Sequence, residues 1–241
     1  MRSNKRVIVA LDVETAGEAR ELVRDLREDA AAFKIGLQLF TAAGPQLVRE
    51  LASENRVFLD LKFHDIPNTV AKAAVEASRL GVWMFNIHTS GGSEMMRRTV
   101  GDVADFCTRE NISRPLVIGV TVLTSSDANT LTEIGIEKSA EEQVTHLARL
   151  AAQSGLDGIV ASPLEALRIR ESVDKSDFVI VTPGVRPEFG TKYDQKRVMT
   201  PRQAVEEGSD YLVMGRPILK AKDRVAALRS ICEEIDSAEN V

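Results

Sequence analysis

The chain has 241 residues, of which 44% are hydrophobic and 28% are charged. This composition is ordinary for a globular protein, and it excludes a disordered chain, a collagen-like chain and a disulfide scaffold. With 31 Lys and Arg against 36 Asp and Glu, the formal net charge is −5. A negative chain is a poor general binder of nucleic acid or of anionic membranes. Any anionic ligand must therefore be captured by local positive groups.

The length fits one α/β barrel, and no linker or composition break divides the sequence. We therefore expect a single domain over residues 1–241. Cys107 and Cys232 lie far apart without metal-ligand spacing, which is typical of reduced cytosolic thiols. The apolar run Val7–Leu11 is too short for the core of a signal peptide, and no run approaches the roughly 18 apolar residues of a membrane span. We expect a cytoplasmic protein.

Short apolar runs rich in β-branched residues alternate with helical patterns along the chain. Eight runs are predicted to be strands: Arg6–Asp12, Ala32–Gly36, Val57–Lys62, Val82–His88, Leu116–Leu123, Gly158–Ser162, Phe178–Pro183 and Tyr211–Gly215. Several of them are continuously apolar, as expected for a parallel sheet that is covered on both faces. Amphipathic stripes predict helices at Gly17–Glu28, Asn68–Leu80 and Asp223–Ile235.

Helix starts are marked by Ser or Thr followed three residues later by Glu or Gln, the capping-box pattern. The three instances are Ser139 with Glu142, Ser162 with Glu165 and Thr200 with Gln203. Two connections are longer than average, at residues 124–137 and 186–199. The second is polar, contains Gly190, and is expected to act as a lid over a site.

Eight strands with helices between them predict the α/β class and a closed (β/α)8 TIM barrel. The alternative is an open, doubly wound sheet. A dinucleotide-binding version of that sheet is disfavoured, because no G-x-G-x-x-G follows the first strand.

Charged and polar residues stand at the C-terminal ends of the predicted strands, where a barrel holds its active site. They are Asp12, Lys34, Asp60, Lys62, Asp65, His88, Thr124, Arg186 and Arg216. Asp60 and Lys62 are two positions apart in one strand and so share a face. Buried Lys and Asp are rare unless paired, so the cluster is either a site for a small anionic substrate or a structural salt-bridge network. Lys34 alone could also reach solvent.

The ends of the last two strands have the composition of a phosphate site. Gly184 and Arg186 follow the seventh strand, and Gly215 and Arg216 follow the eighth. Glycine lets backbone N–H groups approach phosphate oxygens, and arginine adds a charged fork. The alternative is tight-turn glycines beside solvated arginines.

Other candidate chemistry is weaker. His64 and His146 favour structural roles, whereas His88 is open to either reading. Three scattered histidines do not make a metal site. Ser90 has no evident base partner, so a Ser-His-Asp hydrolase is poorly supported.

The segment Asp60-Leu-Lys-Phe-His-Asp-Ile-Pro-Asn-Thr69 resembles the D-x-K-x-x-D-I-P-N-T signature of the orotidine 5′-phosphate decarboxylase family, in its bacterial form. Further segments match the family in order along essentially the whole chain: Val9–Asp12, Phe33–Gly36, His88–Gly92, Val120–Ser125, Thr182–Pro187, Asp194–Gln195 and Met214–Pro217. The resemblance implies a barrel enzyme that converts orotidine 5′-monophosphate (OMP) to UMP and CO2, the last step of de novo UMP synthesis. It implies no metal and no organic cofactor. It also implies a homodimer whose active sites lie at the subunit interface.

The resemblance also implies roles for individual residues. Lys62 would stabilise the carbanion left by CO2 and donate the replacing proton, with Asp60 near the substrate carboxylate. Lys34 and Asp65 would hold these two charges in place, and Asp65 and Thr69 would reach over from the partner subunit.

Substrate contacts follow from the same resemblance. Asp12 and Lys34 would contact the ribose hydroxyls, and Thr124 would help position the base. The phosphate would be held by a set of residues that comes from the last two loops: Arg186, Gln195, Gly215 and Arg216.

Two rival functions remain. Related barrels act on sugar phosphates as decarboxylases or epimerases; some of these share D-x-K-x-x-D but use Mg2+ and carry an acid where this chain has Lys34. Lys34 and the I-P-N-T segment therefore favour the nucleotide enzyme. A non-catalytic phosphate-ligand binder on the same scaffold is the second rival, and it would not need both Lys62 and the Asp60/Asp65 pair.

Overall fold

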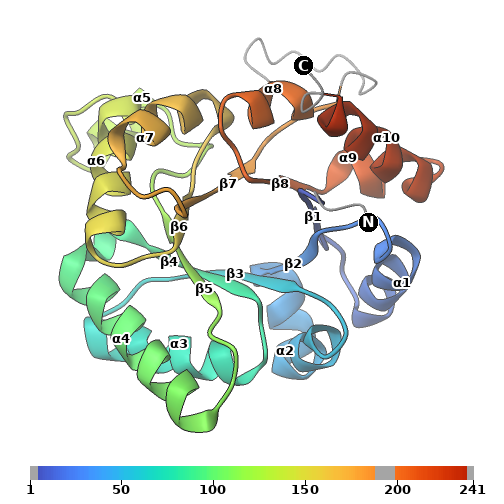
Figure 1. The fold of residues 1–241 in the computed structure, drawn as a ribbon, viewed down its shortest axis with the longest axis horizontal. Helices are drawn as coiled ribbons and strands as arrows, with labels where there is room; N and C mark the ends of the chain where they lie inside the picture. Colours follow the sequence, from blue (N-terminus) through green and yellow to red (C-terminus); the bar gives the residue numbers. More distant parts are fainter. Residues whose placement is uncertain (1–4, 188–198, 238–241) are drawn as a thin grey trace.

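Eight parallel strands close into a barrel in the sequential order β1 to β8 (Figure 1). The computed structural model describes residues 5–187 and 199–237. The strands are β1 Val7–Ala10, β2 Ala32–Gly36, β3 Val57–Phe63, β4 Met84–His88, β5 Leu116–Val120, β6 Gly158–Val160, β7 Val179–Pro183 and β8 Tyr211–Met214. Closure between β8 and β1, with Val7 opposite Leu212, confirms the predicted barrel and excludes the open sheet.

Helices surround the strands and cover the outer face of the barrel (Figure 1). They are α1 Ala16–Leu26, α2 Leu37–Ala52, α3 Pro67–Arg79, α4 Gly92–Glu110, α5 Ala128–Glu133, α6 Ala140–Gln153, α7 Ala166–Ser172, α8 Pro201–Glu206, α9 Arg216–Leu219 and α10 Arg224–Asp236, with 3-10 turns η1 Thr89–Gly91 and η2 Pro163–Glu165. In the part of the chain that the structure describes, no helix is both long and apolar enough to cross a membrane.

The predicted strand ends need adjustment. β1 ends at Ala10 and β5 at Val120, so Asp12 and Leu123 lie beyond the ladder. One hydrogen bond to β2 continues past the end of β1, because the Leu11 N–H donates to the Lys34 carbonyl at 3.0 Å. The apolar residues that follow Ala10 and Val120 are included in the predicted strands because they still line or cover the end of the barrel.

All three predicted capping boxes are present, at Ser139, Ser162 and Thr200. A fourth begins α1, where Thr15 and Glu18 exchange the same bonds. The connection over residues 124–137 contains the short helix α5 rather than a plain loop. The expected lid lies mostly outside the described residues, and the bond from the Arg186 N–H to the Met199 carbonyl, 3.1 Å long, joins its two ends.

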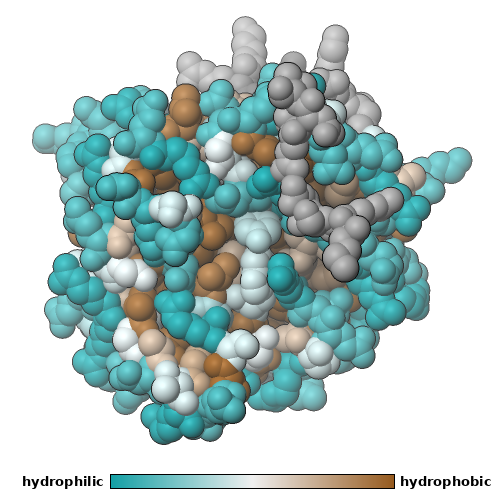
Figure 2. Space-filling model, viewed as in Figure 1, coloured by the Kyte–Doolittle hydropathy of each residue, from teal (hydrophilic) through white to brown (hydrophobic). Residues whose placement is uncertain are grey.

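The core has two layers. The larger lies between strands and helices, and the smaller fills the barrel interior with Ile8, Ala32, Phe58, Met84, Ile118 and Val181. Trp83 and Tyr211 pack against the interior cluster with their rings 5.1 Å apart, edge to face. Figure 2 shows hydrophilic side chains around the rim of one face, with apolar ones nearer its middle. The interior is thus a packed plug rather than a pore.

Candidate active site

The site residues lie next to the apolar cluster of the barrel interior, one layer closer to the C-terminal ends of the strands. Strand side chains two positions apart share a face, so Lys34 follows Ala32, Asp60 follows Phe58 and Asn86 follows Met84 on the inward side. These positions are at the C-terminal ends of the strands, and beyond them opens a cavity of about 330 Å³. The strand-end rule applied to the sequence therefore points to the end of the barrel that holds this cavity.

Eight of the predicted site residues line this cavity: Asp12, Lys34, Asp60, Lys62, Thr124, Arg186, Gly215 and Arg216. Asp65 and Thr69 are exposed outside it. Gln195, also predicted as a site residue, lies outside the described residues. Lys34 does not reach solvent as a lone strand lysine could, because only 10% of its side chain is accessible.

Charges of opposite sign alternate across the floor of the cavity. Lys34 Nζ lies 3.1 Å from Asp12 Oδ1 and 3.6 Å from Asp60 Oδ2, while Lys62 Nζ lies 2.6 Å from Asp60 Oδ1. The Asp60 side chain is only 14% exposed. A carboxylate this buried is tolerable because two cations and their hydrogen bonds replace its lost hydration.

The two lysines decide the ionisation of Asp60. Burial raises the pKa of this carboxyl, but Lys34, Lys62 and the hydrogen bonds from Lys62 and Asn86 together outweigh it. The pKa of Asp60 therefore lies below its ordinary value, and the group is an anion at neutral pH.

The backbone around Lys62 is unusual. Lys62 has a φ of 52°, one of two positive values among the described non-glycine residues. Such a conformation costs on the order of 1–3 kcal/mol and persists only where neighbours enforce it. The strand register also shifts here, because Leu59 pairs with Phe85 and Phe63 with Ile87.

Asn86 holds this irregular stretch, and it is not among the site residues predicted from the sequence. Its Oδ1 accepts from the Lys62 backbone N–H at 2.8 Å, and its Nδ2 donates to Asp60 Oδ1 at 2.7 Å. The available signal was a lone amide in the apolar run Met84–His88. Because an amide carries no charge, a search for charged strand ends passes over it.

The opposite side of the cavity is basic. Arg186 and Arg216 both line it, and burial followed by repulsion from Arg216 lowers the pKa of Arg186. Gly184 has a φ of 86°, which glycine adopts without strain. At Gly215 an added Cβ would stand 3.1 Å from Asp12 Oδ2, so glycine permits this close approach. Two adjacent guanidinium groups suit an anion such as a phosphate.

The histidines are not placed as metal ligands. The His64 and His88 rings lie 5.3 Å apart, and His146 is exposed on α6. Burial, then the charges of His64 and Lys62, lower the pKa of His88, so its neutral form is favoured. Within residues 5–187 and 199–237, no group of three or more His, Cys, Asp or Glu could hold a metal ion.

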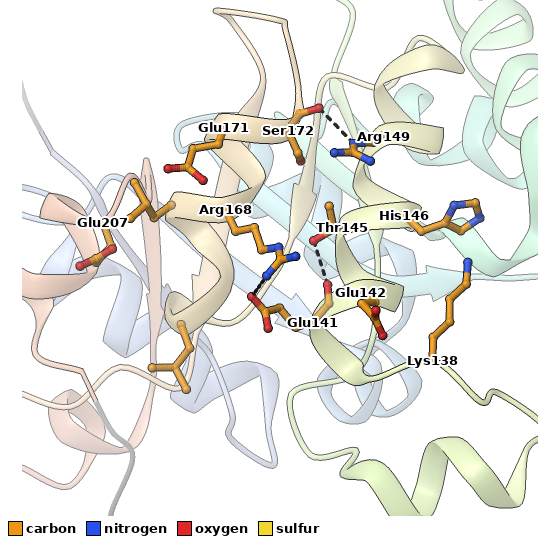
Figure 3. A pocket seen from close by; sticks show the side chains of 12 residues that line it. Lys138, Glu141, Glu142, Thr145, His146, Arg149, Arg168, Glu171, Ser172 and Glu207 are labelled. Atoms are coloured by element: carbon orange, nitrogen blue, oxygen red, sulfur yellow. Dashed lines mark hydrogen bonds and ion pairs between the residues drawn. The ribbon is translucent and has the colours of Figure 1, made fainter.

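A larger hollow, of about 870 Å³, lies on the outer surface along α6 and α7 (Figure 3). Arg168 pairs with Glu141 there, and Arg149 donates to the Ser172 carbonyl at 3.3 Å. Acidic and basic groups are mixed along its length. The volume of a hollow therefore does not identify the reaction site. The smaller cavity in the barrel is the better candidate, because charged side chains converge on it.

A closed barrel with alternating charges at one end of its cavity and paired arginines at the other has the form of a TIM-barrel enzyme that acts on a small anionic substrate. The chain belongs to the orotidine 5′-phosphate decarboxylase / HUMPS family, which it matches over residues 5–231.

Named relatives agree with this membership. The chain is 51% identical to the orotidine 5′-phosphate decarboxylase of Syntrophotalea carbinolica, over 99% of this chain and 98% of that protein. It is also 51% identical to the enzyme of the same name from Moorella thermoacetica, over 98% and 94%. A crystal structure of orotidine 5′-phosphate decarboxylase from Lactobacillus acidophilus superposes with a TM-score of 0.84 at 36% identity, covering 97% of this chain and all of that one.

Proposed function

We propose that this protein decarboxylates OMP to UMP and CO2 in pyrimidine biosynthesis, and that its whole length forms one catalytic barrel domain. The observation that carries this function is the Lys34–Asp60–Lys62 charge alternation at the cavity floor. Family membership and relatives at about 50% identity support the same reaction.

The chemistry needs a cation beside the reacting carbon. When the bond from C6 of the pyrimidine to the carboxyl carbon breaks, the electron pair stays in the ring plane, where the π system cannot delocalise it. An ammonium group at C6 stabilises this charge more in the transition state than in the ground state. Lys62 takes this role, passes one proton to C6, and regains a proton from solvent.

Asp60 lies beside the substrate carboxylate in this proposal. The two like charges repel in the bound substrate, and the repulsion ends as CO2 leaves. Lys34, 3.6 Å from Asp60 Oδ2, holds Asp60 in place. Asp12 and Lys34 contact the ribose hydroxyls, and Thr124 positions the base.

The phosphate binds at the basic side of the cavity, to Arg186, Gln195, Gly215 and Arg216. This group is remote from the bond that breaks. Its binding energy is available to hold the pyrimidine in place against the charges at the cavity floor.

A second copy of the chain completes the site in this proposal. Asp65 and Thr69 are exposed, and between them Ile66 has 66% of its surface in water. An exposed large apolar side chain beside polar site residues fits a subunit interface. The proposed assembly is a homodimer with Asp65 and Thr69 contributed across the interface. We place it in the cytoplasm, where the reduced cysteines expected from the sequence are stable.

The test is a UV assay of the purified protein with OMP, in the presence of EDTA and alongside Lys62→Ala. We expect the orotate absorbance to fall in the wild type only and EDTA to leave the rate unchanged, because a lysine cation supplies the stabilising charge. Loss of activity with EDTA, restored by Mg2+, would favour the sugar-phosphate rival. Binding of UMP without turnover of OMP would favour the non-catalytic binder.

A further inference from the structure

The irregular pairing of β3 with β4 gives Asn86 a position that no other residue of β4 has. Leu59 pairs with Phe85, and the next pair is Phe63 with Ile87. Three residues of β3, from Asp60 to Lys62, therefore face the single β4 residue Asn86. An insertion of this kind leaves backbone groups without ladder partners.

The side chain of Asn86 satisfies this irregularity and at the same time contacts the reactive charges. Its Oδ1 takes the Lys62 N–H that the bulge has removed from the ladder, and its Nδ2 donates to Asp60 Oδ1. Only 1% of Asn86 is accessible. A backbone N–H can only donate and a carboxylate can only accept, so an amide fits the two neighbours in one orientation.

We propose that Asn86 is a positioning residue for the decarboxylation: its amide fixes the left-handed backbone of Lys62 and, with the same group, the orientation of Asp60. This inference rests on the proposed function. It adds a neutral residue that hydrogen-bonds to both Asp60 and Lys62 although it does not itself line the cavity. Because one amide sets both positions, Lys62 Nζ and Asp60 Oδ1 keep their 2.6 Å separation.

Several titratable groups face this contact and bear on its pH dependence. They are Lys34 from β2, Asp60 and Lys62 from β3, His88 from β4 and His64 after β3. The neighbouring β5 residue in register, Ile118, is apolar. Asp60 is ionised near neutrality, so in the wild type the amide donates to an anion throughout the range from pH 5.5 to 8.

The informative variant is Asn86→Asp, which keeps the shape and the acceptor but replaces the Nδ2 donor. At pH 8 the new carboxylate repels Asp60, and kcat should fall by about 10²-fold, as for misplaced catalytic groups. At lower pH the two carboxyls share one proton, which restores a donor between them. We expect kcat of this variant to rise from pH 8 to 5.5, with KM changed much less than kcat.

A second measurement does not depend on turnover. In Asn86→Ala, 13C NMR titration of the Asp60 carboxyl should show its pKa raised relative to the wild type, because one hydrogen bond to the anion is lost. The control is Thr99→Val, which deletes a buried hydroxyl bond to the Met95 carbonyl in α4, away from the cavity. This control should leave kcat, its pH profile and the Asp60 pKa unchanged.

The outcomes separate the two proposals. Failure of the wild type to convert OMP refutes the proposed function, whereas the Asp60 titration still decides the Asn86 contact. Wild-type turnover together with unchanged kcat and Asp60 pKa in both Asn86 variants overturns the positioning role. A loss of kcat in Asn86→Asp that is the same at pH 5.5 and pH 8 overturns it as well, since a merely structural defect would not respond to the shared proton.

Discussion

In the proposed mechanism, Lys62 acts on the reaction and Arg186 acts on substrate binding, although both line one cavity. Lys62 Nζ is within hydrogen-bond distance of Asp60 at the floor of the cavity, where the proposed mechanism places the developing charge. Arg186 lines the same cavity next to Arg216, at the site proposed for the phosphate. The phosphate does not change during the reaction, so its contacts are equally strong before and after the bond breaks.

The change Lys62→Ala should abolish turnover, whereas Arg186→Ala should mainly raise KM. The first variant removes a cation that acts on the transition state, and the second removes a contact made to the bound substrate. Steady-state kinetics with OMP measure both effects. Equal losses of kcat at unchanged KM in the two variants would contradict this division.

The charged residues of the candidate site could be predicted from the sequence, but Asn86, the uncharged residue that hydrogen-bonds to two of them, could not. Strand-end position alone brings Asp12, Lys34, Asp60 and Lys62 together, because parallel strands of a barrel end at the same face. The bulge that turns Lys62 to a positive φ depends on how two strands pair, and no local pattern encodes it. Asn86 matters through that pairing, so it becomes visible only in three dimensions.

At the scale of elements, two helix starts share the same predicted capping box but differ in how deeply the capping glutamate is buried. Ser139 with Glu142 begins α6, and Ser162 with Glu165 begins η2, each with both reciprocal bonds present. Glu142 is exposed, and its pKa is lowered, chiefly by the hydrogen bonds from Ser139. Burial raises the pKa of Glu165 to about 7, despite the opposing hydrogen bond from Ser162. The sequence pattern specifies the bonds but not the burial.

This burial predicts a pH-dependent stability that Glu165→Gln should remove. The folded protein holds the Glu165 proton more tightly than the unfolded chain, whose glutamates titrate near 4.5. Its contribution to stability is therefore complete below about pH 4.5 and is lost as the pH rises through about 7, by at most about 1.4 kcal/mol per pH unit. Between pH 5 and pH 7.5, the Tm of the wild type should fall relative to that of Glu165→Gln.

The matched control is Glu142→Gln, which makes the same change in a solvent-exposed capping box. Glutamine retains an acceptor oxygen, so both variants keep the cap itself. Glu142→Gln should follow the wild-type dependence of Tm on pH. A parallel course of wild type and Glu165→Gln over this range would show that Glu165 is not protonated in the folded protein.

At the scale of the whole molecule, one barrel holds most but not all of the proposed site. The apolar interior plug and the surrounding helices fix the strand ends that carry Lys34, Asp60 and Lys62. Asp65 lies in the connection after β3 and Thr69 lies in the first turn of α3, yet both are exposed outside the cavity. The fold of one chain could be predicted from its pattern of strands and helices. The completion of a site by a second chain leaves no such periodic signal, and here its prediction rests on the family resemblance.

Subunit complementation tests this arrangement. If Asp65 acts across the interface, a heterodimer of one Lys62→Ala subunit and one Asp65→Ala subunit contains one site with both defects and one site with neither. Tagged heterodimers, purified through both tags, should therefore show about half of the wild-type activity, although each variant homodimer is inactive. The control pairs Lys62→Ala with Lys34→Ala; both residues line the same chain's cavity, so each site of that heterodimer carries one defect and activity should stay absent. No recovery in the Lys62→Ala and Asp65→Ala pair, or a chain that remains monomeric while active, would place Asp65 outside the partner's site.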